Sequence, residues 1–113
     1  MAGHEIKQNE WISFINDFNK KNRDKLVDIE VTDDKKNKVE ERVGLPLKEV
    51  AVSLTDKEYP IISFIAGASN EASHHIGHAS HLVYEETDNG NPKALRIESS
   101  KGRSAKISFQ NTP

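Results

Sequence analysis

One stretch of the sequence decides the fold class: residues 9–19, NEWISFINDFN. Its large apolar side chains recur at i, i+3, i+4 and i+7, the spacing of one α-helical face: Trp11, Phe14, Ile15 and Phe18. Asn9 precedes this stripe and is the expected N-cap of the helix. Because large aromatic side chains dominate core burial, we interpret the stripe as a face packed on a sheet rather than as a cofactor-binding surface.

Downstream of the helix, apolar residues recur at every second position, which is the period of a β-strand. Val27, Ile29 and Val31 alternate with two acidic residues and predict a strand with one exposed side. Similar segments follow at residues 39–43, 50–54, 59–65, 82–84, 94–97 and 105–109. The predicted fold class is α+β, in a single domain that spans residues 1–113. The N-terminal helix would pack on a twisted antiparallel sheet or open barrel of six to seven strands, which ends in a C-terminal β-meander.

Turn residues separate these segments. Asp33–Asn37, Asp88–Gly90 and Ser99–Gly102 predict tight connections, the second because Asn-Gly tolerates a positive φ. Pro46 is expected to interrupt pairing, since proline donates no hydrogen bond to a strand ladder. Residues 67–73 are expected to form a loop of small side chains. The expected core consists of Trp11, Phe14, Phe18, Val27, Ile29, Val52, Ile62, Phe64, Leu95, Ile97, Ile107 and Phe109.

The composition limits the classes of function. Charged residues make up 30% of the chain with a net charge of −2, so there is no basic field to attract nucleic acid or an anionic membrane. The absence of cysteine excludes disulfides, thiolate nucleophiles and cysteine-containing zinc motifs, and it favours a reducing compartment. No signal-peptide pattern opens the chain, and the apolar-rich residues 60–68 are too few to cross a bilayer. We expect a cytoplasmic protein.

Several short motifs are spread over nearly the whole chain: the helix that opens on Trp11 with Phe14 and Phe18, Gly44-Leu-Pro-Leu47, His75-Ile76, Val83-Tyr-Glu-Glu-Thr87, Leu95-Arg-Ile-Glu-Ser99, Gly102 and Phe109. Together they resemble a family of small bacterial single-domain proteins of unknown function. The resemblance implies a stand-alone bacterial domain, and it transfers no activity and no functional residue. His74, His78 and His81 depart from the family pattern, which argues against a shared role for the histidines as a group.

The main candidate site is the segment SHHIGHASHL, residues 73–82, which holds four of the five histidines: His74, His75, His78 and His81. In a helix, His74, His78 and His81 would share a face and could offer nitrogens to a Zn²⁺ ion. In an extended segment, His75 and His81 would lie on one side and His74 and His78 on the other, so no single ion could be held by all four. Glu85 or Glu86 could add a carboxylate.

Two other interpretations of this segment remain open. The histidines can be solvent-facing side chains in a linker between two strands, which is the simplest one. They can also form a pH-responsive patch, in which mutual repulsion lowers their apparent pKa values and loosens the loop below about pH 6.

Three hypotheses of function follow. The first is a non-enzymatic binding or accessory domain that acts on a protein or small-molecule partner through a sheet face, barrel mouth or edge. The second is a metal-binding protein or metal-dependent hydrolase that uses the histidine segment. The third is a weak binder of RNA or single strands, which the acidic balance disfavours; its candidate cations are Lys20, Lys21, Arg23, Lys25, Lys35, Lys36, Lys38, Lys101, Arg103 and Lys106. No serine lies in a Gly-x-Ser-x-Gly turn, and no phosphate-binding glycine loop is present.

Overall fold

The computed structural model describes residues 2–56, 58–69 and 71–110, apart from the side chain of residue 2. A short 3₁₀ turn, η1 (Gln8–Glu10), leads into the helix α1 (Trp11–Asn22). The strands are β1 (Ala2–Ile6), β2 (Leu26–Thr32), β3 (Lys38–Ser53), β4 (Ile61–Ala66), β5 (Ala72–Ile76), β6 (Ala79–Glu86), β7 (Pro92–Ser99) and β8 (Ser104–Phe109). All strand pairs are antiparallel, in the order β1-β6-β7-β8-β2-β3-β4-β5. The α+β class and the open antiparallel sheet are therefore confirmed.

The predicted number of strands was wrong, because the described residues form eight. β1 and β5 were not expected, since neither carries a strict apolar alternation of its own. Conversely, the segments predicted at 39–43 and 50–54 fall in one long strand, β3, which ends one residue earlier, at Ser53. Residues 72–73, expected in a loop, begin β5.

β3 is continuous through Pro46 because the strand changes partner there. Its first half pairs with β2 up to Pro46, and its second half pairs with β4 from Leu47 onward. The proline ring removes a donor only at this crossing point. Leu47 donates to the carbonyl of Lys25 and accepts from Asp24, which ties the crossing to the segment before β2. β3 therefore keeps a backbone partner on both sides of Pro46, with β2 before it and β4 after it.

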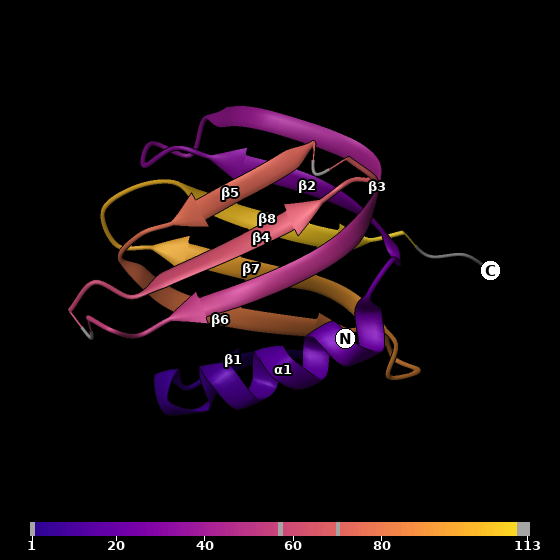
Figure 1. Ribbon diagram of the computed structural model, residues 1–113, viewed down its shortest axis with the longest axis horizontal. Coiled ribbons are helices and arrows are strands. Elements are labelled where there is room, and N and C mark those ends of the chain that lie inside the picture. Colours follow the sequence, from indigo (N-terminus) through magenta and orange to yellow (C-terminus); the bar gives the residue numbers. More distant parts are fainter. Residues whose placement is uncertain (1, 57, 70, 111–113) are drawn as a thin grey trace.

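The bend of β3 folds the sheet into two layers (Figure 1). One layer runs from β1 through β6, β7, β8 and β2 to the first half of β3, and the other contains the second half of β3 with β4 and β5. The inward side chains of both layers form one core together with α1. β1 and β5 end the order without pairing to each other, so the barrel stays open.

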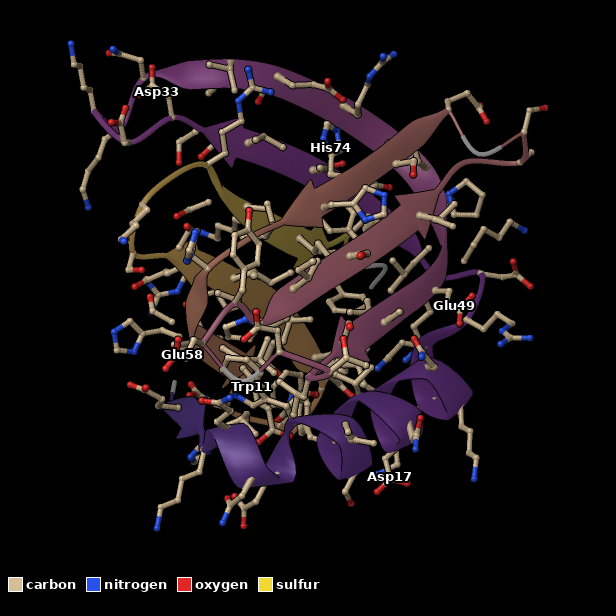
Figure 2. The ribbon with its side chains drawn as sticks, turned by 60° about the vertical axis from the view of Figure 1, so that its left-hand side comes forward. Trp11, Asp17, Asp33, Glu49, Glu58 and His74 are labelled. Carbon is tan, nitrogen blue, oxygen red and sulfur yellow. The ribbon has the colours of Figure 1, made fainter. Side chains whose placement is uncertain are left out.

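The helix forms where the apolar stripe predicts it, but it is shifted along the chain. It begins at Trp11 and ends at Asn22, three residues beyond the expected end, and Asn9 lies in η1 instead of acting as the N-cap. Trp11, Ile15 and Phe18 are buried, and the Trp11 indole donates to the carbonyl of Ile6 (2.8 Å). Figure 2 shows Trp11 facing the sheet and Asp17 facing away from it.

An asparagine joins the helix to the sheet. The amide of Asn19 donates to the carbonyl of Val50 (2.8 Å) and accepts from its N–H (2.9 Å). The side chain therefore acts like a peptide group of a neighbouring strand and satisfies part of the free edge of β3's second half.

The predicted core is largely confirmed. Ten of the twelve expected residues are buried, while Phe14 and Val52 are half-buried and pack against the core. Phe14 contacts Tyr84 edge-on (centroids 5.3 Å apart), and Phe18 contacts Phe109 in the same way (5.8 Å). In the described part of the chain, no helix is long and apolar enough to cross a membrane.

Candidate functional site

The histidine segment forms two strands joined by a tight turn. His74 and His75 lie on β5, Gly77 and His78 form the turn, and His81 lies on β6. His78 adopts a positive φ of 49°, and its carbonyl accepts a hydrogen bond from the N–H of Ser100 (3.1 Å). The turn is thereby fixed against the end of β7. Of the two geometries considered for this segment, the extended one is found.

His74 points toward the core and joins the two layers. Its Nε2 donates to Oε2 of Glu40 on the first half of β3 (2.9 Å), and Arg42 donates to the same oxygen (3.3 Å). Figure 2 shows His74 between β5 and β3. The hydrogen bond from His74 is the main cause that holds the pKa of the Glu40 carboxyl below its usual value. This contact links strands that share no backbone pairing.

His75 and His78 contact two further partners. His75 lies on the outer side of β5, where Nδ1 is 2.8 Å from Oγ of Ser63 on β4. The ring of His78 lies against Tyr59 with centroids 3.9 Å apart. A Cβ added at Gly77 would lie 2.9 Å from the Tyr59 hydroxyl, so Tyr59 covers the turn closely. The Ser63–His75 pair has no carboxylate to orient the ring among the described contacts, so it lacks the third member of a catalytic triad.

His81 is paired across the β1–β6 ladder. Its Nδ1 donates to Oε2 of Glu5 (2.6 Å). This hydrogen bond is the main cause that raises the pKa of His81, against a smaller lowering by burial. The direction is opposite to the one expected for mutually repelling imidazoles. The Glu5 contact therefore gives no support at His81 to the hypothesis of a patch with lowered pKa values, which stays a prediction.

The expected carboxylate ligands also have other partners. Glu85 lies 2.9 Å from Nε of Arg96, at the distance of an ion pair but without the alignment of a hydrogen bond. Glu86 lies 3.9 Å from His4. Among residues 2–56, 58–69 and 71–110, no three His, Cys, Asp or Glu side chains gather in a group that could hold a metal ion. The four histidines thus reach four separate partners, and the proposed Zn²⁺ site stays a prediction for metal analysis.

A second candidate lies on the outer side of the larger layer. It is a cavity of about 340 Å³ between the β2–β3 turn and the β7–β8 turn. Glu30, Lys106 and Arg96 lie in one row across β2, β8 and β7, because Glu30 and Arg96 are both register partners of Lys106. The two turns contribute Asp33, Lys36 and Ser100 to the lining of the cavity. The outward positions of three strands and the ends of two hairpins therefore build this cavity.

The hydrogen-bonding groups of the cavity are only partly used by the protein itself. Glu30 pairs with Lys38 (3.2 Å), and Arg96 pairs with Glu85 and with Glu98 (3.4 Å). Asp33 accepts backbone hydrogen bonds from Asn37 and Lys35, and the bond from Asn37 is the main cause that lowers the pKa of its carboxyl. In the described part of the chain, no ion pair or hydrogen bond engages the Lys106 ammonium. An exposed cation without a partner among the described residues therefore lines a polar cavity.

Comparison of this chain with protein-family models, with curated proteins and with solved structures gave no match. The resemblance to a small bacterial family accordingly stays a prediction. The functional interpretation of the site therefore depends on the contacts and the cavity described above.

The sequence could have indicated part of this second site. Glu30, Arg96 and Lys106 each occupy the polar position between two apolar residues of a strand, which marks them as outward-facing. The order of β2, β8 and β7 in the sheet could not be read from that pattern. Only the register brings residues 30, 96 and 106 into one row.

Proposed function

We propose that this chain is a non-enzymatic binding domain and that the outer cavity takes a small, highly polar ligand. The observation that carries the proposal is the cavity of about 340 Å³ that is lined by the unengaged Lys106. This volume falls within the range of small-molecule sites, roughly 300–1,000 Å³. The histidine segment gives less support to catalysis, because each imidazole has a different partner.

The lining indicates the character of the ligand. Carboxylates, ammonium groups and hydroxyls from Asp33, Lys36, Ser100 and Lys106 surround the cavity, and no aromatic side chain lines it. Recognition would therefore depend on hydrogen bonds and charge rather than on apolar contact. A zwitterion or a polyhydroxylated molecule, with or without an acidic group, matches this mixture better than a flat apolar compound does.

Titration of ¹⁵N-labelled protein with a panel of amino acids, sugars and sugar phosphates tests the proposal. We expect saturable shifts confined to the amides of residues 30–36, 96–102 and 104–106. Lys106→Ala should weaken binding about tenfold, because a hydrogen bond to a charged group contributes roughly 1.5–3 kcal/mol. Lys20→Ala on the exposed side of α1 serves as the matched control and should leave binding unchanged. No response to the panel, or equal affinity in Lys106→Ala, would contradict the cavity as the site.

The two competing hypotheses have their own tests. Near-stoichiometric Zn, Ni or Mn in protein purified without an affinity tag would favour a metal-dependent protein that uses His74, His75, His78 or His81. Binding of single-stranded RNA that weakens steeply with salt and with loss of the lysines would favour the third hypothesis.

A further inference from the structure

β5 (Ala72–Ile76) ends the sheet and offers a free strand edge. It pairs with β4 through five consecutive register partners without a bulge, and within the described residues no strand pairs with its other side. Figure 1 shows β5 at the margin of its layer. A regular strand edge presents a row of backbone donors and acceptors that another strand can use.

β5 lacks the features that protect the other free edges of this protein. β1 carries the charged Glu5, which is paired with His81 on the neighbouring strand β6. The first half of β3 carries charged side chains and two register shifts against β2, with Gly44 at a positive φ of 72° beside one of them. Ala72–Ile76 contains no Lys, Arg, Asp, Glu, Pro or Gly. Charges, bulges and prolines are the usual devices against edge pairing, so β5 is the unprotected edge.

The surface next to this edge is almost uncharged. We call it the neutral face and define it by the outward residues of β3's second half, β4 and β5: Glu49, Ala51, Ser53, Ile61, Ser63, Ile65, Ser73 and His75. Among these eight residues Glu49 is the one formal charge with histidine neutral, and Lys48 at the bulge beside it is paired with Asp24. A strand added to β5 would extend this face and would meet little charge repulsion.

We propose that β5 pairs antiparallel with β5 of a second copy of this chain, centred on His74. In this register His74 faces His74 of the second copy, Ser73 faces its His75, and Ala72 faces its Ile76. The arrangement has twofold symmetry and therefore needs one self-complementary patch only. The outward residues of both copies stay on the same side of the joined sheet, because opposed residues in an antiparallel pair face the same way.

The strand sequence is complementary to itself in this register. Within one copy, His75 already pairs with a serine, since its Nδ1 lies 2.8 Å from Oγ of Ser63 across the β4–β5 ladder. Ser73 of the second copy would stand on the opposite side of the same ring and could use its second nitrogen. The row Ser63–His75–Ser73 would then cross the dimer interface. The inward pair of Ala72 and Ile76 places a small side chain opposite a large one.

Sedimentation velocity over a range of protein concentrations tests the proposal. We expect a dimer whose dissociation constant rises by about tenfold or more in Ser73→Lys, because a lysine on an edge strand opposes strand pairing. Ser53→Lys is the matched control, since it places the same charge on the same face but on β3. It should leave the dimer intact. A native chain that stays monomeric, or equal effects of the two substitutions, would overturn the proposal.

A single introduced cysteine tests the register. The chain has no cysteine, so His74→Cys places one thiol at the residue that faces its own copy. Directly opposed Cα atoms in antiparallel strands are roughly 4.5–5.5 Å apart, within disulfide reach. Mild oxidation should give a covalent dimer with His74→Cys and none with Ser53→Cys. Absence of the covalent dimer in a variant with native circular dichroism would refute pairing centred on His74.

Discussion

The two layers share one core but present different outer surfaces. The outward residues of β2, β8, β7 and β6 include Glu30, Lys106, Arg96, Glu98 and Glu85, which we call the charged face. Among the eight outward residues that define the neutral face on β3, β4 and β5, Glu49 is the one formal charge. The fully buried inward residues of the strands are apolar in both layers, while the half-buried His74 and Glu40 form a polar contact between the layers. The comparison teaches that the inward-facing side chains of the strands determine the fold, while the outward-facing side chains are free to determine what the protein contacts.

The largest effects should come from the core that both layers share. Phe18 packs from α1 beneath the charged-face layer, and Phe64 packs from β4 beneath the neutral face. Each change to alanine should cost about 3–5 kcal/mol of unfolding free energy, measured by urea denaturation. Phe14→Ala should lower the free energy of unfolding by less, because Phe14 is only half-buried.

A shared core also predicts one cooperative transition in both variants. Two separate transitions, or a loss below about 1 kcal/mol for Phe64→Ala with a full loss for Phe18→Ala, would mean that the layers unfold independently.

The next largest effect should come from the link between the helix and β3. Asn19→Ala would leave the N–H and C=O of Val50 without their partner, at a cost of about 1–3 kcal/mol. Asn9→Ala, in the exposed η1 turn, serves as the same substitution without such a link and should stay within about 0.5 kcal/mol. Equal losses in the two variants, compared by thermal unfolding, would show that the amide of Asn19 does not hold the edge of β3.

A smaller, pH-dependent effect should come from the contact between the layers. Because the pKa of Glu40 lies below its usual value of 4.5 in the folded protein, its contribution to stability is present above pH 4.5. That contribution is lost as the pH falls through the folded-state pKa. Glu40→Gln should therefore destabilise by on the order of 1 kcal/mol at pH 7 and by progressively less toward pH 3. Urea titrations at pH 7, 5 and 3 measure this, and a difference that grows in acid would contradict it.

The smallest effect should come from the exposed pair on the charged-face layer. Because the pKa of His81 lies above its usual value of 6.5, its contribution is fully present below pH 6.5 and is lost as the pH rises through the folded-state pKa. Both side chains are about half exposed, so His81→Gln should cost only a few tenths of a kcal/mol at pH 6. At pH 9 the variant and the native chain should have equal stability. Thermal melts at pH 6 and pH 9 measure this. A stability difference between His81→Gln and the native chain that is larger at pH 9 than at pH 6 would argue against the pair with Glu5.

The candidate sites were less predictable than the fold. The segment 73–82 was notable in the sequence because its histidines are close along the chain, yet alternation in β5 sends His74 inward and His75 outward. Its neighbours in space come from residues 5, 40, 59 and 63, which no local pattern connects to it. The cavity was not predicted, since its residues come from three strands whose order the sequence leaves open.

The sequence by itself determined the helix with its buried stripe, most of the strands, the turns at Asp33–Asn37 and Asp88–Gly90, and nearly all of the core. These features depend on neighbours within a few positions, where helical and strand periods act directly on the residues. Only the tertiary structure decided that β3 bends and changes partner at Pro46, that β1 and β5 are strands, and which side chain meets each histidine. Those features depend on backbone pairing between distant segments, whose hydrogen bonds carry no side-chain pattern to read.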